Sequence, residues 1–340
     1  PLMHGATTIL YEGKPVGTPD ASAFWRVCAE HGVNVLFTAP TAFRAIKRED
    51  PSGGRMREFD LSRLRLLFLA GERCDPDTLG WAGERLGIPV IDHWWQTELG
   101  WPAIANCAGL GLQAIKPGSP TRPVPGYDIR VLADDGHEAG PDEIGNIAIR
   151  LPLPPGTLTT LWHNDAGYET SYLTRFPGFY LTGDAGFRDA DGYFYVMSRI
   201  DDLINVAGHR LSTGGIEEVL AGHPDVAECA VIGAADTLKG EVPLGFVVLK
   251  AGVSRADAEI VAELVERVRN SIGAFACFRH AIVVQALPKT RSGKILRGTM
   301  KRIADGSDYT VPATIEDVAV LGDVAARIRS MAPGAGSTMA

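Results

Sequence analysis

The stretch of the chain richest in reactive side chains is residues 181–211, where acids, arginines and glycines lie close together. Asp184 follows Thr182 and Gly183. Its two carboxylate oxygens can accept hydrogen bonds from both hydroxyls of a ribose. Aspartate is also common in tight turns, so a structural role in a turn is the alternative. In residues 198–210 the strand-like alternation stops and is replaced by the charged residues Arg199, Asp201, Asp202 and Arg210 and the small pair Ala207-Gly208. This pattern is typical of a connection between domains, of a ligand-lined loop or of a charged surface loop.

A second polar segment, residues 289–294, carries the cations Lys289, Arg291 and Lys294 beside a serine and a glycine. The spacing does not match the G-x-x-x-x-G-K-[ST] phosphate loop, so we exclude that motif. The segment can still contact a phosphate, or it can be a solvated basic loop. Lysine suits a reaction in which negative charge builds up on phosphate oxygens, because its ammonium acts as a mobile point charge.

Trp94 and Trp95 precede Gln96-Thr97-Glu98. Together they offer a stacking ring, a hydroxyl for a phosphate and a carboxylate for a hard cation. Paired tryptophans are more often part of a core, but the polar triplet at a strand end favours a ligand site.

The elements that must position these groups alternate between strand and helix in the first part of the chain. This order predicts a parallel sheet whose ligands bind at the carboxyl ends of the strands, where Gly71-Glu72 and Trp94–Glu98 lie. The predicted strands are 9–12, 33–37, 64–70 and 90–91, and the predicted helices are 20–31, 41–48 and 76–86.

After Pro117 the pattern becomes β-rich, with predicted strands at 127–132 and 145–151 and a hairpin whose strands, 185–187 and 193–197, are joined by a two-residue turn at Asp191-Gly192. A compact unit follows, with helices at 215–221 and 254–272, strands at 226–232, 245–250 and 281–285, and a short basic helix after Lys294. Ser254 and Asp257 predict a capping box, and residues 305–340 a loosely ordered tail.

Composition narrows the classes of function. A net charge of −8 argues against broad binding to nucleic acid or anionic membranes, and no apolar run reaches the ~20 residues of a membrane span. Five scattered cysteines without a C-x-x-C spacing indicate reduced thiols in a cytosol-like compartment, and the eight histidines lack metal-ligand spacing. The first residues read like the interior of a domain, so we expect a fragment whose targeting segment is not visible.

In order and spacing, six motifs across residues 1–304 resemble those of the adenylate-forming acyl-CoA synthetases: PLMHGATTILYEG, TAPTAFRAI, LAGERCDP, DHWWQTE, the run from YLTGD to GGIEEVL, and LPKTRSGKILR. The short-chain members, acetyl-CoA and propionyl-CoA synthetase, are the most similar. The sequences of the first motif, PLMHGATTILYEG, and of AGERCDPDT are more similar to those of the propionyl-CoA synthetases.

The resemblance implies an α/β fold in which residues 1–200 are the C-terminal part of the large AMP-binding domain, a βα sheet plus a β-rich subdomain. Residues 201–304 are then a small, mobile α+β C-terminal domain that rotates about a hinge at Asp201. The implied reaction has two steps. A small carboxylate attacks the α-phosphate of MgATP to give acyl-AMP and pyrophosphate, and the thiol of coenzyme A then displaces AMP to give the acyl-CoA thioester.

Residue roles follow from the same resemblance. Lys294 is the catalytic lysine and a target for enzymes that acylate and deacylate lysine, and Glu98 helps to hold Mg²⁺. Trp95 closes the acyl pocket beside Ala70, which replaces a bulkier valine of the acetate enzymes. The residues implied to contact ATP or AMP are Gly71, Glu72, Asp92, His93, Trp94, Gln96, Thr97, Asp184, Arg199 and Arg210, and those implied to contact coenzyme A are Ala207, Gly208 and Arg269.

Two departures from the family pattern matter. Arg73 stands where many relatives have proline, and the upstream Ser/Thr/Gly-rich phosphate loop is absent, so we expect this chain alone not to be a competent catalyst. Three interpretations remain: a propionate enzyme, an enzyme for acetate or another short acid, and a non-catalytic nucleotide-binding remnant. The expected location is the cytoplasm, or the mitochondrial matrix in a eukaryote.

Overall fold

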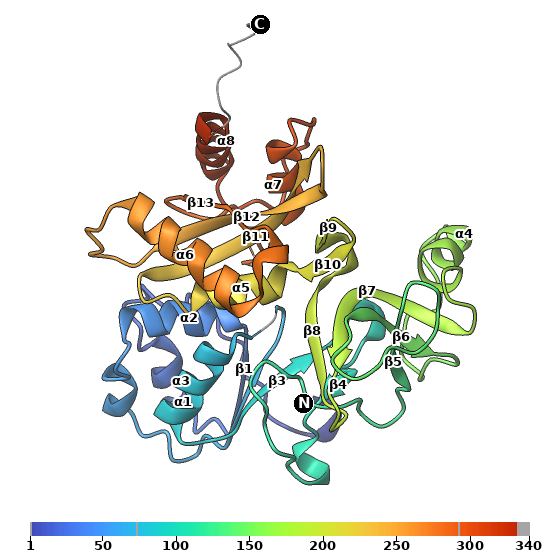
Figure 1. Ribbon diagram of the computed structural model, residues 1–340. Helices are drawn as coiled ribbons and strands as arrows, with labels where there is room; N and C mark the ends of the chain where they lie inside the picture. Colours follow the sequence, from blue (N-terminus) through green and yellow to red (C-terminus); the bar gives the residue numbers. More distant parts are fainter. Residues whose placement is uncertain (1, 73, 292, 332–340) are drawn as a thin grey trace, which may run out of the picture. The chain divides into compact units, whose positions relative to one another are not determined.

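The computed structural model describes residues 2–72, 74–291 and 293–331 (Figure 1). It divides into two compact units, of which the first comprises Pro1–Trp95 and Pro102–Thr121 and the second Gln96–Trp101 and Arg122–Ala340. Arg73 and Ser292, both singled out in the sequence, lie outside the described residues.

The first unit is built on a four-stranded sheet in the order β1-β2-β3-β4. The strands β1 (Val35–Thr38), β2 (Leu66–Leu69) and β3 (Val90–Trp94) are parallel, which confirms the predicted parallel sheet. The short β4 (Ile104–Ala105) runs antiparallel to β3. Residues 9–12 do not form the predicted strand: the structure gives them no partner strand, and Leu10 is 92% exposed. The 3₁₀ turns of this unit are η1 (Leu2–His4), η2 (Arg55–Glu58) and η4 (Ala108–Leu110).

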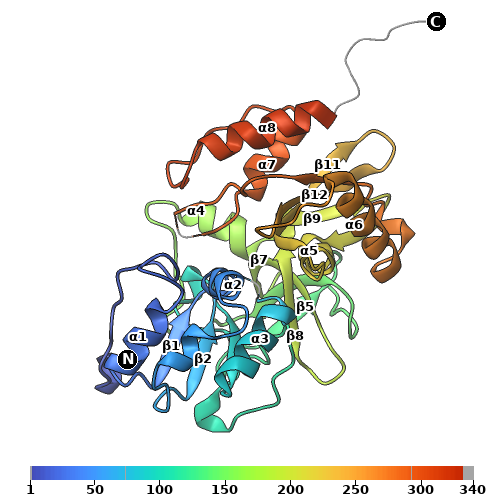
Figure 2. The same cartoon turned by 90° about the vertical axis from the view of Figure 1, so that its left-hand side faces the viewer.

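Three helices pack on the sheet face that carries Leu67 and Leu69: α1 (Ala23–Glu30), α2 (Pro40–Glu49) and α3 (Pro76–Leu86) (Figure 2). Their aromatic and aliphatic side chains, including Trp25, Phe43 and Trp81, form one buried cluster with these two leucines. Local sequence sets the ends of α3. Asp75 accepts a hydrogen bond from the Thr78 N–H (2.8 Å) at the start, and Gly87, at φ 65°, ends the helix.

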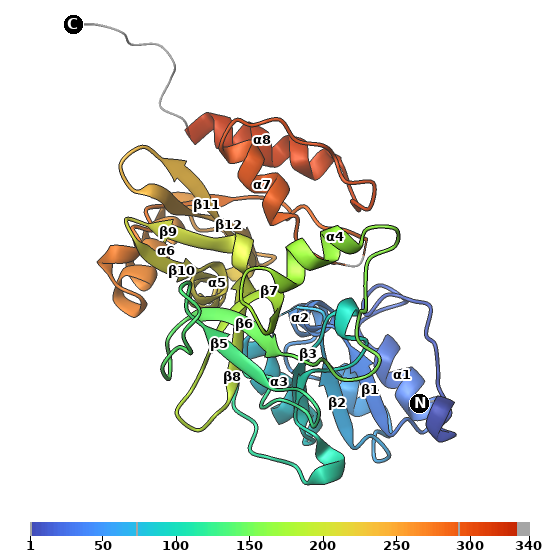
Figure 3. The same ribbon diagram turned by 90° about the vertical axis from the view of Figure 1, so that its right-hand side faces the viewer.

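The β-rich part of the second unit is an antiparallel sheet in the order β5-β6-β7-β8. Its strands are β5 (Ile129–Leu132), β6 (Gly145–Arg150), β7 (Phe179–Arg188) and β8 (Phe194–Arg199), and α4 (Asp165–Tyr168) and the π-helical η5 (Glu169–Leu173) lie between β6 and β7 in the chain (Figure 3). The predicted hairpin is present, but its loop has three residues, because Asp189 N–H pairs with the Tyr193 carbonyl and only Gly192 has a positive φ, 83°.

The remainder of the second unit is a three-layer sandwich (Figure 1). Its sheet has the order β10-β9-β12-β11, with β13 paired to β12. One core cluster joins α5 and α6 to this sheet, and another joins α7 and α8 to it. The elements are η6 (Ile200–Asp202), β9 (Leu203–Val206), β10 (His209–Ser212), α5 (Thr213–Ala221), β11 (Val226–Asp236), β12 (Gly240–Leu249), α6 (Asp257–Ser271), η7 (Ala274–Ala276), β13 (His280–Val283), α7 (Arg297–Ala304) and α8 (Ala319–Met331).

Three sequence expectations are corrected here. Residues 198–210, expected to be a connection between domains or a loop, contain strand β9 and the start of β10. The helix expected from Ser254 begins at Asp257, and its N-cap, Ala256, makes no side-chain capping bond. The segment expected to be a loosely ordered tail contains α8, whose Val324 is completely buried because it packs into the α7 side of the core.

Among the described residues, no helix is long and apolar enough to cross a membrane.

Candidate functional site

The β7–β8 hairpin brings Asp184 and Arg199 together, because its register places the two residues directly opposite each other. Arg199 Nη1 donates to Asp184 Oδ1 at 3.3 Å, and Gln96 Nε2 donates to Asp184 Oδ2 at 2.6 Å. Both donors also reach the Thr182 carbonyl, at 3.2 and 2.7 Å. Asp184 is therefore a buried carboxylate, 7% exposed, whose two oxygens are both oriented by side chains predicted to bind nucleotide.

Gly183 is required beside this aspartate for two reasons. Its φ is 75°, which strains any other residue, and a Cβ atom here would lie 2.4 Å from Arg199 Nη2. The glycine thus allows the guanidinium of Arg199 to lie against the backbone next to Asp184.

Glu98, the predicted Mg²⁺ ligand, lies in η3 (Thr97–Leu99) of the second unit, with Thr97 exposed beside it. The Glu98 carbonyl accepts from the Leu158 N–H at 2.6 Å. Burial, then the negative charge of the nearby Glu98, raises the pKa of the Tyr172 hydroxyl. The Tyr172 ring stacks on Tyr180 with centroids 5.0 Å apart. Sequence reasoning missed Tyr172, which is held near Glu98 by this tertiary packing.

A magnesium ion fits a site of this kind when the nucleotide supplies most of its oxygen ligands. Within the described ranges, no group of three or more His, Cys, Asp or Glu side chains is placed to hold a metal by itself. Glu98 offers one oriented carboxylate, and Mg²⁺ is commonly bound by one or two carboxylates together with substrate phosphates.

In the first unit, Ala70, Gly71 and Glu72 follow the carboxyl end of β2. Gly71 adopts φ 105° with open space around it, so the backbone can lie close to a flat ligand. Glu72 is held by Arg44 Nη1 at 2.7 Å, and Arg44 Nε also binds Asp75 at 2.8 Å. Burial alone would lower the pKa of Arg44, but the charges of Glu72 and Asp75 outweigh it and raise that pKa. Arg44 thereby fixes the Gly-Glu segment, and sequence reasoning did not identify it.

The alternation of β3 separates the predicted adenine-binding residues. Asp92 pairs in register with Leu69, on the helix-covered face, and Trp94 shares that face. His93 points to the opposite face, where its ring contacts Phe37 and Phe68 at centroid distances of 5.2 and 5.6 Å. Burial lowers the pKa of His93. The structure therefore does not bring the His93 side chain beside Asp92 and Trp94, and any contact with a nucleotide on their face would come from its backbone.

Trp95, the predicted floor of the acyl pocket, is 41% exposed, whereas Ala70 is buried. Their roles in acid selection remain predictions.

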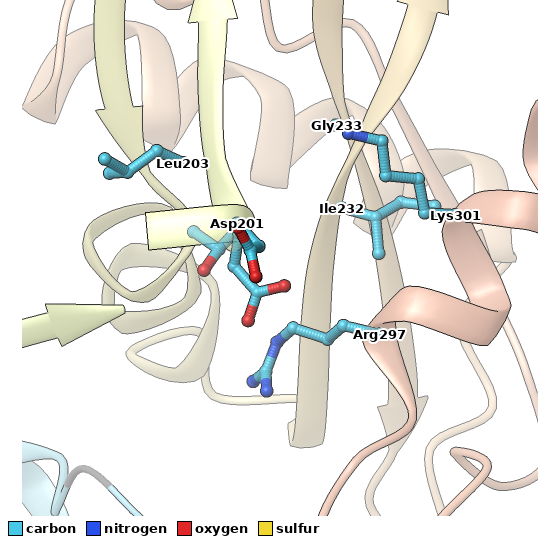
Figure 4. Close-up of a pocket in the computed structure, with 8 residues that line it drawn as sticks. Asp201, Leu203, Ile232, Gly233, Arg297 and Lys301 are labelled. Atoms are coloured by element: carbon cyan, nitrogen blue, oxygen red, sulfur yellow. The ribbon is translucent and has the colours of Figure 1, made fainter. Parts of the chain in front are cut away.

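The predicted hinge residue Asp201 lies in η6, between β8 and β9. Next to it, Asp202 lines a cavity of about 10 Å³, the size of one water molecule, with Arg297 and Lys301 of α7. Figure 4 shows Arg297 extending from α7, with Ile232 and Gly233 of β11 lining the same cavity, and the Arg297 guanidinium pairs with Glu217 at 2.9 Å. Burial raises the pKa of Asp202, and Arg297 only partly offsets this effect.

We expect Asp202→Asn to raise the melting temperature at pH 7. Because the folded-state pKa is raised, folding favours the protonated acid, and the ionised carboxylate costs stability as the pH rises through that pKa. The gain should disappear below about pH 4, where the unfolded state also binds the proton. Thermal unfolding from pH 4 to 8 measures this effect, with Asp308→Asn, at an exposed aspartate that does not line the cavity, as the matched control. A lower melting temperature at pH 7 would show that the attraction to Arg297 dominates.

Arg210, predicted to reach the phosphates, lies in β10 and pairs with Asp134 at 2.7 Å. Asp134 also binds Arg175 at 2.9 Å. Arg210 thus contacts Asp134 and not the Asp184 cluster, by which we mean Asp184, Gln96 and Arg199. Ala207 and Gly208 form the turn between β9 and β10, both with positive φ, and Arg269 is exposed in the last turn of α6. Lys294 is exposed in the loop between β13 and α7.

Comparison with known proteins identifies the protein family to which the chain belongs. The AMP-binding enzyme model matches residues 1–156, and the model of the AMP-binding enzyme C-terminal domain matches residues 215–294. The chain therefore belongs to the AMP-binding enzymes, and its α/β fold class is confirmed as predicted.

The names of similar curated proteins narrow the family further than the family models do. The chain is 56% identical to an uncharacterized protein of Pseudomonas aeruginosa, over 97% of this chain and 52% of that protein. It is 51% identical to the mouse acyl-CoA synthetase short-chain family member 3, mitochondrial (95% and 48%), and 42% identical to a propionate–CoA ligase of Salmonella typhimurium (95% and 52%). The chain spans about half the length of the curated relatives it matches.

Among solved structures, the anthranilate CoA ligase AuaEII in complex with anthranoyl-AMP is similar, with a TM-score of 0.75 and 30% identity. The match covers 88% of this chain and 55% of that one.

Proposed function

We propose that the intact protein is an AMP-forming ligase that joins a short-chain carboxylic acid, propionate in preference to acetate, to coenzyme A. The observation that carries the proposal is the Asp184 cluster. A buried carboxylate is oriented by Gln96 and Arg199, at the positions where the motifs of acyl-CoA synthetases imply ribose binding. The similarity to the mouse acyl-CoA synthetase short-chain family member 3 and to the Salmonella propionate–CoA ligase supports the choice of a short acid.

In this proposal the chain's residues divide the work between two steps. Gly71, Glu72 and Trp94 receive the adenine, and Asp184 with Arg199 holds the ribose. Thr97 contacts the α-phosphate. Mg²⁺, held through Glu98, neutralises phosphate charge when bound. Lys294 brings a cation to the α-phosphate as charge builds up there, and rotation at Asp201 then presents Ala207, Gly208 and Arg269 to coenzyme A.

The preference for propionate rests on Trp95 and Ala70. A tryptophan at the pocket floor limits the chain length of the acid, and alanine in place of valine leaves room for about one more methylene. Such a difference is worth only ~1–3 kcal/mol, so acetate should remain a slower substrate.

The test compares acetate, propionate and butyrate in thioester formation by the intact protein, with pyrophosphate and AMP measured as products. We expect the highest kcat/KM for propionate, about tenfold or more above acetate. A clear acetate preference would point to an acetyl-CoA synthetase. Calorimetric binding of AMP and ATP without pyrophosphate release from any acid would identify a non-catalytic nucleotide-binding protein instead.

A further inference from the structure

The loop that carries Lys294 is paired with a segment that follows α7. Arg291 N–H donates to the Thr314 carbonyl, and Glu316 N–H donates to the Lys289 carbonyl, both at 2.9 Å. These two bonds flank an antiparallel bridge between Thr290 and Ile315. The loop is therefore paired along one edge with residues 314–316 through a single antiparallel bridge.

The same loop is also closed on itself. Thr290 N–H donates to the Lys294 carbonyl at 2.8 Å, and Lys294 N–H donates to Thr290 Oγ1 at 3.1 Å. Lys289 pairs with Glu228 at 2.6 Å, which ties the start of the loop to β11. The backbone of Lys294 is thus fixed, although its side chain is exposed.

The pairing segment is itself anchored to the core. Ile315 is buried, and the Asp317 carboxylate accepts from the Ala319 N–H at 2.8 Å at the start of α8. In α8, Val324 is fully buried among core side chains of α7 and the sheet. Arg327 Nη1 donates to the Val283 carbonyl of β13 at 2.6 Å. A path of ordered contacts therefore runs from the core, through α8 and residues 314–316, to the lysine loop.

We propose that residues 312–330, which we name the C-terminal clamp, position the Lys294 loop for the adenylation step. The proposal rests on the proposed function, because it takes Lys294 as the lysine that acts on the α-phosphate. A lysine side chain is a flexible four-carbon chain, so its ammonium can sample many positions. An ordered backbone at Lys294 limits the volume that the ammonium samples. An unpaired loop would hold the same charge less often in the productive position.

The test replaces Glu316 with proline, which removes the N–H that donates to Lys289. Proline also favours an extended conformation in the preceding residue, so the bridge geometry of Ile315 is not opposed. Glu316→Ala is the matched control, because it removes the same exposed side chain and keeps the N–H.

Two readouts are measured on the intact protein. The first is the rate of trypsin cleavage after Arg291 and Lys294, followed by mass spectrometry. We expect Glu316→Pro to raise that rate about tenfold, which is about 1.4 kcal/mol, and Glu316→Ala to leave it unchanged. The second compares the half-reactions: adenylation should fall about tenfold, while thioester formation from supplied propionyl-AMP should be unaffected.

A folded Glu316→Pro variant with unchanged cleavage, or with both half-reactions reduced equally, would overturn the clamp. If this variant does not fold, Val324→Ala, which weakens the anchor in α8, should give the same pattern with a smaller amplitude. Failure of the proposed function would look different. The wild-type protein would then release no pyrophosphate with any short acid, and the cleavage rates would still decide whether the clamp orders the loop.

Discussion

Replacing Lys294 with alanine in the intact protein is expected to abolish adenylation and to leave thioester formation from supplied propionyl-AMP largely intact. Adenylation builds negative charge on the phosphate oxygens, and a cation brought to that position stabilises the transition state. Losing one preorganised donor of this kind typically costs ~2.7–4 kcal/mol, or roughly 10²–10³ in kcat. Pyrophosphate exchange measures the first step, and release of coenzyme A thioester from acyl-AMP measures the second.

Arg291→Ala is the matched control for this experiment. Arg291 is an exposed cation of the same loop, and the variant keeps the backbone N–H that bonds Thr314. If Arg291→Ala reduces adenylation as strongly as Lys294→Ala, the loop acts through its general positive charge. Equal loss of both half-reactions in Lys294→Ala would contradict a role specific to adenylation.

Local signals in the sequence were sufficient for most of the fold. The bounds of α3 were predicted correctly because Asp75, Pro76 and Gly87 define a start and an end within a few residues. The strand expected at residues 9–12 failed because a strand needs a partner, which local alternation does not reveal. Helix α8 was missed although residues 321, 324, 325 and 328 keep helical spacing, because the polar and glycine-rich flanks dominated the interpretation.

The candidate site was only partly predictable, and sequence distance explains the difference. Asp184 and Arg199 lie on one hairpin and are close in the sequence, although a β-bulge between Ala185 and Gly186 shifts the register between the turn and this pair. Arg44 is 28 residues from Glu72, and Asp134 is 76 residues from Arg210. Such pairs form only when the chain folds, and no local pattern indicates them. The same holds for Tyr172 and the C-terminal clamp, which act through residues remote in the chain.

Asp184→Asn is expected to weaken AMP and ATP binding about 30-fold or more and, unlike Lys294→Ala, to reduce both half-reactions. In the proposed reaction the ribose must be held in each step, whereas the Lys294 charge is needed in only one. Asparagine also places an amide in contact with two donors, Gln96 Nε2 and Arg199 Nη1, and leaves the arginine without its counter-charge. Replacing a charged hydrogen-bond acceptor of the ribose hydroxyls by a neutral one costs about 2 kcal/mol or more, which corresponds to that loss of affinity.

Calorimetric titration with AMP measures this loss directly, both on the intact protein and on this 340-residue chain. Asp191→Asn, at the exposed turn of the same hairpin, makes the same chemical change away from the cluster and should bind AMP like the wild type. Asp184→Asn with unchanged AMP affinity would exclude Asp184 as the ribose ligand. In that case the Asp184 carboxylate would serve only to hold Gln96 and Arg199, and the nucleotide would bind at another site.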